Sequence, residues 1–265
     1  MRGVNRRRLL LLVVAAAAGL VLLGILGAAN YAAAQRRAAA FSLKPTSSVP
    51  RPTATPSAVA NRLQATCATP ASIARADDLW VAGAGTMAGY RAHETFLDIT
   101  LPHEAVARTD QVVGNLRVRQ LGPAQIAIQG GCFAVELNTL TSIDELPGRR
   151  AQDRDELYGD FLDTRDYPYA VLTLHRTEVP VFSSRPQHVI VAGDLSVAGA
   201  THPVAVAVDA QTVAGGVQAV GSMAIDAHDF GIRLPGEGDP IVVDSHLTLE
   251  FLLVLEHVDH QTGAN

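Results

Sequence analysis

The sequence predicts an all-β protein: an extended antiparallel barrel of about eight strands with one short helix, following an N-terminal transmembrane helix. Three observations predict this fold. Apolar residues alternate with period two from Gln111 onward, which is the pattern of half-buried strands. Turn residues rich in Gly and Pro separate the alternating runs at hairpin-like distances. An uncharged run of 21 residues, 9–29, precedes all of the strands.

The formal charge of −5 conceals opposite charges in two parts of the chain. Residues 1–76 carry ten of the 21 Lys and Arg residues and no Asp or Glu, which gives +10 and leaves −15 for residues 77–265. An acidic domain without a basic stripe is repelled by phosphate backbones, so we expect no nucleic-acid partner. Its size suits one domain with its own core. We assign the domain to residues 77–257 and a polar tail to residues 258–265.

The N-terminal region predicts a membrane anchor. Residues 1–8 form a basic segment with four arginines, and the apolar segment that follows, residues 9–30, contains no charge. A helix of 21 residues spans about 31 Å, the thickness of the hydrocarbon core of a bilayer. The arginines before the span outnumber the basic residues shortly after it, so residues 1–8 should be cytoplasmic. We therefore expect a single-pass protein of the cell membrane with its domain outside the cytoplasm.

A cleaved signal peptide is the alternative interpretation. Ala32, Ala33 and Ala34 offer small residues at a cleavage site, and Arg6-Arg7 resembles part of a twin-arginine signal. The uncharged run is longer than the usual apolar region of a signal peptide, and the arginines also serve to orient a helix. Cleavage would give a secreted protein, so both interpretations place the domain outside the cytoplasm.

The composition of residues 35–76 predicts a stalk, and one of the two cysteines of the chain lies in it. Residues 35–76 contain five Pro, ten Ser or Thr and no acidic residue, so they cannot bury enough apolar surface to fold alone. Cys67 lies near the end of this stalk and Cys132 lies in the domain. In an oxidising compartment they are candidates for a disulfide, with two unlinked thiols as the alternative.

The strands are indicated in chain order by inward-facing apolar residues at every second position. Each alternating run ends at a Gly or Pro turn, such as Gly130-Gly131 and Gly215-Gly216. The inward-facing sets are Val112, Gly114, Leu116 and Val118; Phe133, Val135 and Leu137; Val189, Val191, Gly193, Leu195 and Val197; Val217, Ala219, Gly221, Met223 and Ile225; and Val243, Ser245, Leu247, Leu249, Phe251, Leu253 and Leu255. The domain is therefore mainly antiparallel β.

Residues 144–166 interrupt this alternation. Twelve of these 23 residues are charged, and Leu157 and Phe161 have the i, i+4 spacing of a helix. We expect a short, solvated helix whose two apolar residues plug the β structure.

A barrel with a ligand space is favoured by small residues on the inner face. Gly114, Gly193, Ala219 and Gly221 leave volume unfilled, and a barrel of eight strands can then hold one elongated ligand. Periodicity alone leaves a filled β-sandwich open as the alternative.

Motifs of catalysis are absent from the sequence. There is no nucleophile elbow, P-loop, dinucleotide fingerprint or His-Glu-x-x-His motif. The nine histidines are scattered, and the close pair His257 and His260 lies at the start of the polar tail. We therefore predict no metal, no cofactor and no catalytic residue, and favour a binding module over an enzyme.

Four segments, in order, resemble the YceI family of lipocalin-like, polyisoprenoid-binding barrels. They are Gly89-Tyr90-Arg91 with Glu94, similar to members from actinobacteria; Arg154-Asp155 with Asp160-Phe161-Leu162-Asp163 and Tyr167-Pro168; the hairpin from Gly193 to Val204; and Asp229-Phe230-Gly231-Ile232 before a closing strand. The resemblance runs from about Trp80 to Glu256. His202 departs from it, because the family commonly has Arg at that position.

The resemblance implies a hydrophobic tunnel that holds an isoprenoid lipid, such as a polyprenyl phosphate or a quinone tail. Together with the alternation it nominates Trp80, Tyr90, Phe133, Leu195, Phe230 and Phe251 as tunnel residues, with ordinary core packing as the alternative for each. Arg91 is the candidate for binding an anionic head group. The expected partners are the lipid and the membrane, and the oligomeric state, a homodimer included, stays open. The alternative function is an extracytoplasmic interaction or structural domain with a filled core and no lipid.

Overall fold

The structure is a computed structural model, which describes residues 38–43, 58–68, 78–97, 102–146 and 148–258. The predicted anchor, residues 9–30, lies outside the described residues. In chain order the elements are α2 (Ala58–Thr66), β1 (Asp78–Ala82), β2 (Met87–Phe96), β3 (His103–Thr109), β4 (Val112–Gly122), β5 (Gln125–Glu136), η1 (Leu137–Thr139), β6 (Thr141–Ser142), α3 (Ala151–Phe161), β7 (Tyr169–Leu174), β8 (Thr177–Pro180), β9 (Gln187–Val197), β10 (Ala200–Val213), β11 (Gly216–Asp226), η2 (Ala227–Phe230), β12 (Ile241–Val243) and β13 (His246–Val258).

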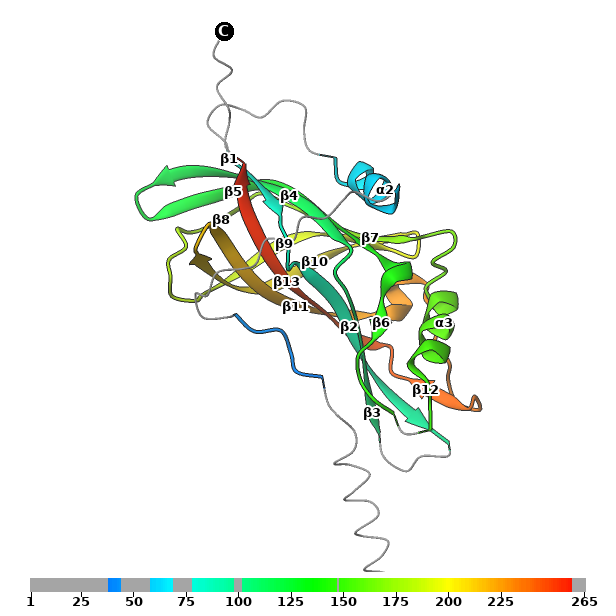
Figure 1. Ribbon diagram of the computed structural model, residues 1–265. Coiled ribbons are helices and arrows are strands. Elements are labelled where there is room, and N and C mark those ends of the chain that lie inside the picture. The colour runs from blue at the N-terminus through cyan, green and yellow to red at the C-terminus, as the bar shows by residue number, and fades with distance from the viewer. Residues whose placement is uncertain (1–37, 44–57, 69–77, 98–101, 147, 259–265) are drawn as a thin grey trace, which may run out of the picture.

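The strands form an antiparallel barrel that closes on itself. Hydrogen bonds join β1, β4, β5, β7, β9, β10, β11 and β13 in that order, and β13 returns to β1 (Figure 1). Closure gives every strand of the ring a hydrogen-bonded neighbour on both sides. The predicted antiparallel barrel of eight strands is confirmed.

Two strands, β1 and β2, share one position of this barrel beside β13. β13 pairs with β1 through residues 255–258 and with β2 through residues 248–252. Between the two, the backbone N–H of Val254 donates to Thr86 Oγ1 (3.1 Å), and the carbonyl of Val254 accepts from the N–H of Gly83 (2.7 Å). These bonds satisfy both backbone groups of Val254 where the ladder is interrupted. β2 continues the sheet to β3, β6 and β12.

A bulge at Gly130 divides the pairing of β5 in the same way. β5 pairs with β7 through residues 131–136 and with β8 through residues 125–128, and its register with β4 shifts between Arg117 and Val118. Gly130 has φ +147°, which glycine tolerates better than any residue with a Cβ. The bulge bends β5, so that it serves two partners on one side.

Helix α3 lies at one end of the barrel, beside β6 (Figure 1). Arg154 and Tyr158 are buried, Phe161 is half-buried, and Leu157 is 38% exposed. The predicted short helix is confirmed, but the prediction that Leu157 packs inward is wrong. The inward stripe of the helix runs through Arg154, Tyr158 and Phe161, because a buried ion pair of Arg154 sets the rotation of the helix.

Two pieces of the predicted stalk pack on the outer face of the barrel. α2 buries Leu63 against Ala134 of β5, together with Cys67. Residues 38–43, which we call the strap, lie over β2 and β3: Arg108 donates to the carbonyl of Ala39 and stacks on Phe41, with 3.9 Å from Cζ to the ring centroid. A segment that cannot fold alone is thus ordered by contacts with the barrel.

Candidate functional site

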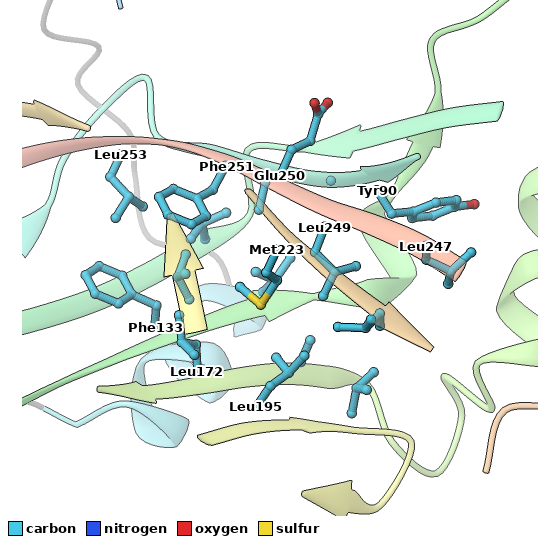
Figure 2. Close-up of a pocket in the computed structure, with 18 of the residues that line it drawn as sticks. Tyr90, Phe133, Leu172, Leu195, Met223, Leu247, Leu249, Glu250, Phe251 and Leu253 are labelled. Carbon is cyan, nitrogen blue, oxygen red and sulfur yellow. The ribbon is translucent and has the colours of Figure 1, made fainter. Parts of the chain in front are cut away.

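The barrel contains a partly open cavity of about 200 Å³. Its lining comes from inward-facing side chains of β2, β4, β5, β7, β9, β10, β11 and β13 and from α3, and nearly all of these side chains are apolar. Glu250 is the one ionisable carboxylate along the lining, but its side chain points away from the enclosed space (Figure 2). A space of this kind favours an apolar ligand over water, because it offers few hydrogen-bond partners.

The inward-facing glycines do not create this space. A Cβ at Gly114 would lie 2.1 Å from Cδ1 of Phe133, and a Cβ at Gly221 would lie 2.2 Å from Cζ of Phe251. Each phenylalanine ring therefore covers the glycine of the paired strand, which a larger residue would prevent. The expectation that small residues leave volume unfilled is wrong at both glycines, because rings from the neighbouring strands fill that volume.

Four of the six predicted tunnel residues line the cavity. Tyr90 on β2, Phe133 on β5, Leu195 on β9 and Phe251 on β13 reach it from four different strands (Figure 2). All except the half-buried Phe251 are less than a tenth exposed. The tertiary structure thus brings together positions that are up to 161 residues apart in the chain.

The other two predicted tunnel residues are not part of the lining. Trp80 on β1 packs edge-on against His257, with 5.1 Å between ring centroids. Phe230 in η2 is buried and packs edge-on against His202, with 4.9 Å between ring centroids. Among the described residues, both side chains contribute to the apolar core around the cavity.

Arg91 lies on the outer face of β2, opposite to Tyr90 and Ala92. Its guanidinium contacts Glu250 Oε2 at 2.8 Å and Glu104 Oε2 at 3.0 Å, and it donates to the carbonyl of Ala38 in the strap. Arg108 binds the same Glu250 carboxylate at 2.6 Å. Hydrogen bonds with these carboxylates raise the pKa of Arg91 against the effect of its burial. The predicted head-group arginine thus joins the barrel to the strap.

Two tyrosines form the α3 end of the cavity. Tyr90 and Tyr158 are 7% and 8% exposed, and their rings meet edge to face with centroids 5.5 Å apart. Burial, followed by the charge of Glu94, raises the pKa of Tyr90 well above its ordinary value, so this phenol stays protonated. The hydroxyl of Tyr158 is buried and has no hydrogen-bond partner among the described residues. The Tyr158 hydroxyl therefore has unused hydrogen-bonding capacity within the core.

A buried ion cluster lies on the far side of these tyrosines. Asp144 Oδ2 lies 2.6 Å from His103 Nε2 and accepts from Arg154 Nη1 at 2.7 Å, while its Oδ1 accepts from the N–H of Val106 at 2.7 Å. Burial alone would raise the pKa of Asp144, but these hydrogen bonds hold it well below the ordinary range. Arg154 thereby fixes α3 to the barrel.

Glu94 belongs to the same cluster but receives no hydrogen bond from the described residues. It follows Tyr90 and Ala92 on the inner face of β2, and its side chain is fully buried. Its nearest cation is Arg154, at 3.8 Å. Burial raises the pKa of Glu94 to about 7, against the lowering effect of Arg154.

Tyr158, Glu94 and Arg154 were not predicted as site residues. Tyr158 lies in a helix that was interpreted as a solvated cap, and Glu94 lies in a strand without acidic neighbours on its own face. Glu94 and Arg154 stand in the segments that resemble the YceI family, which was a signal for these two residues. For Tyr158, the signal was the spacing of Arg154, Tyr158 and Phe161 on one helical stripe, which the many charges of the segment obscured.

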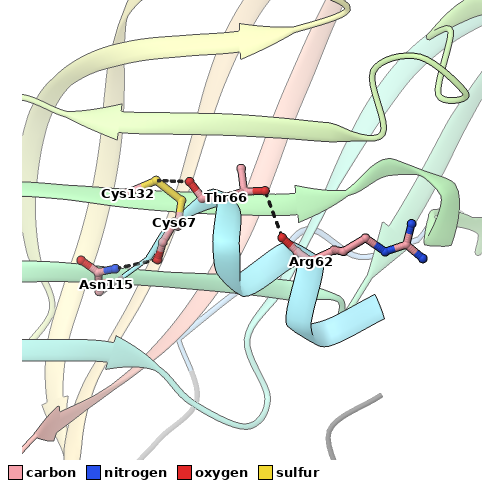
Figure 3. The surroundings of a disulfide bond; sticks show 5 residues. All are labelled: Arg62, Thr66, Cys67, Asn115 and Cys132. Carbon is pink, nitrogen blue, oxygen red and sulfur yellow. Dashed lines mark hydrogen bonds between the residues drawn. A yellow bond between two sulfur atoms is a disulfide. The ribbon is translucent and has the colours of Figure 1, made fainter. Parts of the chain in front are cut away.

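The predicted disulfide is confirmed. Cys67 and Cys132 are bonded across 65 residues, with their Cα atoms 5.5 Å apart. The bond fixes the end of α2 to β5 (Figure 3). Beside it, Nδ2 of Asn115 donates to the carbonyl of Cys67 at 3.1 Å. The last part of the predicted stalk is therefore attached to the barrel.

Within the part of the chain that the structure describes, no group of His, Cys, Asp and Glu side chains is arranged to hold a metal ion. None of the helices in that part is long and apolar enough to cross a membrane.

The chain is similar to known proteins of one family. A model of the YceI-like domain family matches residues 91–255. No curated protein matches the chain.

Solved structures of three bacterial proteins are similar to this chain. One is a polyisoprenoid binding domain from Saccharophagus degradans implicated in plant cell wall breakdown, with 14% identity, a TM-score of 0.44, and coverage of 69% of this chain and 99% of that one. Burkholderia cenocepacia BcnA has 15% identity, a TM-score of 0.43, and coverage of 62% and 95%. A Campylobacter jejuni YCEI protein has 13% identity, a TM-score of 0.32, and coverage of 50% and 74%.

Proposed function

The chain belongs to the YceI-like domain family, and from this we propose that it is a membrane-tethered, extracytoplasmic protein that holds a long isoprenoid lipid in the barrel cavity. The lipid is a polyprenyl phosphate or a quinone, bound through its tail. The observation that carries the proposal is the cavity inside the barrel, whose lining is almost wholly apolar.

Burial of the tail supplies the binding energy. Apolar surface removed from water contributes about 25 cal/mol per Å², so burying about 300 Å² of a branched chain gives on the order of 7 kcal/mol before the cost of association. No covalent step is needed for this kind of binding. The alternative, an interaction domain with a filled core, leaves this cavity unexplained.

The apolar run of residues 9–29 and the arginines before it support the tether. The strap, residues 38–43, begins shortly after that run and packs on β2 and β3. We infer that the barrel is held close to the outer surface of the membrane, where it can exchange a lipid with the bilayer.

A substitution that fills the cavity tests this function. Ala219 on β11 is buried and lines the cavity, whereas Ala224 on the same strand is exposed. We expect the full chain, purified in mild detergent and extracted with organic solvent, to yield an isoprenoid by mass spectrometry. Ala219→Leu should remove that lipid, because the added carbons occupy its space, and Ala224→Leu should retain it.

Circular dichroism checks that both variants are folded. The proposal fails if the wild-type chain yields no isoprenoid and binds none when offered, or if Ala219→Leu retains as much lipid as Ala224→Leu.

A further inference from the structure

We propose that the outer face of β2 and β3 is a docking surface for the strap, residues 38–43, and that docking sets the length of the tether between the membrane span and the barrel. The proposal rests on the membrane tether of the proposed function and goes beyond it. It does not depend on which lipid the cavity holds.

A glycine makes the docking surface possible. Gly89 on β2 pairs with Glu250 of β13 on one side and with Arg108 of β3 on the other. A Cβ at Gly89 would lie 2.8 Å from Cγ of Arg108. Because position 89 has no side chain, Arg108 crosses β2 and reaches Glu250 Oε1, at 2.8 Å from Nε and 2.6 Å from Nη2. Three strands thus contribute to one row of the docking surface.

Two guanidinium groups of this surface bind the main chain of the strap. Arg91 and Arg108 share the carboxylate of Glu250, and their side chains are only 14% and 13% exposed. A guanidinium carries five N–H donors, so each arginine keeps donors beyond those that its carboxylate partners use. One such donor of Arg91 binds the carbonyl of Ala38 at 3.1 Å, and one of Arg108 binds the carbonyl of Ala39.

Phe41 makes the contact specific for the strap. Its ring centroid lies 3.9 Å from Cζ of Arg108, which is within the range of a cation–π interaction. Any extended segment offers carbonyl groups, but Phe41 is the one aromatic residue of residues 35–76. The sequence therefore marks a single point of the predicted stalk for docking on the barrel.

Docking shortens the tether. The apolar run ends at residue 29 and the strap begins at residue 38, so the eight residues 30–37 separate them. An extended chain of this length spans at most about 30 Å. Without the strap, the next attached segment is α2, and residues 30–57 before it can span about 100 Å. The docked strap therefore keeps the barrel at a distance from which it can exchange lipid with the bilayer.

Chymotrypsin cleavage after Phe41 measures docking, because the protease requires a released strap. The full chain is digested in mild detergent, and the cut is followed by mass spectrometry. Arg108→Ala should speed this cut about ten-fold, since the lost contacts raise the population of the released strap. Arg176→Ala is the matched control: it removes an arginine that is 53% exposed and paired with Glu178, and it should be cut like the wild type.

Energy transfer measures the length of the tether. The single tryptophan, Trp80, is the donor, and dansyl-labelled phosphatidylethanolamine in phosphatidylcholine vesicles is the acceptor. An insertion of about twenty Gly and Ser residues after Pro50 lies behind the strap and should leave the transfer unchanged in the wild type. The same insertion should lower the transfer in Phe41→Ala, because the released tether then includes the inserted residues. An insertion after Ala34, ahead of the strap, should lower it in both.

Circular dichroism checks that the variants are folded, and Phe41→Ala leaves every residue of the barrel in place. Equal cleavage rates in the wild type and Arg108→Ala, or an equal effect of the insertion after Pro50 in the wild type and Phe41→Ala, would overturn the docking proposal. Either result would leave the membrane tether and lipid binding standing. If the wild-type chain is not retained by the vesicles, the membrane tether and the docking proposal are both overturned.

Discussion

The carboxylate of Glu94 is buried on the inner face of β2 with no hydrogen-bond donor among the described residues. Burial raises its pKa from the ordinary value of 4.5 to about 7. The folded state therefore binds a proton that the unfolded chain has already released between these two pH values. The resulting contribution of Glu94 to the free energy of unfolding is fully present below pH 4.5, and it is lost as the pH rises through about 7.

Replacement of Glu94 by Gln should remove this pH dependence. We expect the wild-type chain to lose on the order of 3 kcal/mol of unfolding free energy between about pH 5 and about pH 8 from this group, and the variant to lose little. Urea unfolding of both proteins at the two pH values measures the difference. Parallel pH profiles for the wild type and E94Q would show that Glu94 does not titrate in this range.

The elements added to the barrel are held by specific contacts. The apolar residues of α2 are mostly small, and Leu63 is buried against Ala134 of β5. The disulfide from Cys67 to Cys132 and the hydrogen bond from Asn115 to Cys67 hold its C-terminal end. α3 depends instead on the ion pair of Arg154 with Asp144. The composition of each helix therefore says little about why it is ordered.

Loss of the disulfide should weaken both α2 and the whole chain. Cross-linking across 65 residues restricts the unfolded chain by about 4 kcal/mol in the chain-entropy model. Cys132→Ala should lower the unfolding free energy by about this amount and expose residues 58–66 to protease. Cys67→Ala and chemical reduction should do the same, and an unchanged unfolding curve in the three cases would contradict this role of the bond.

The whole molecule is a closed ring around an apolar space, so stability and binding are coupled. A ligand that binds only the folded barrel adds RT ln(1 + [L]/Kd), which is about 2.7 kcal/mol at a hundred-fold excess over Kd. For a domain of this size, that corresponds to a rise in thermal midpoint of roughly 5–10 °C.

Geranylgeraniol should therefore raise the unfolding temperature of the full chain. Calorimetry or circular dichroism measures the shift, which should disappear in Ala219→Leu because the cavity is filled, and remain in Ala224→Leu because that side chain is exposed. A shift of equal size in both variants would mean that the lipid binds outside the cavity.

Much of the barrel was predictable because period-two alternation is a local signal. The inward positions of β4, β5, β9, β11 and β13 follow directly from it, since a one-residue slip would expose every apolar side chain. The order of four short segments also resembled the YceI family, and the match of the family model to residues 91–255 confirms that resemblance. The partners of Arg91 were not predictable, because Glu250 lies 159 residues away and becomes a neighbour through the pairing of β2 with β13.

The sequence by itself determined the inward faces of β4, β5, β9, β11 and β13, the two cysteines that are candidates for a disulfide, and the opposite charges of the leader and the domain. These depend on local alternation and composition. The tertiary structure decided where the cavity lies, that rings of Phe133 and Phe251 cover the inner glycines, and that Arg154 and Tyr158 are buried on the inner side of α3. It did so because closure of the barrel sets which strands are neighbours, and because Arg154 finds its partner Asp144 only in the folded chain.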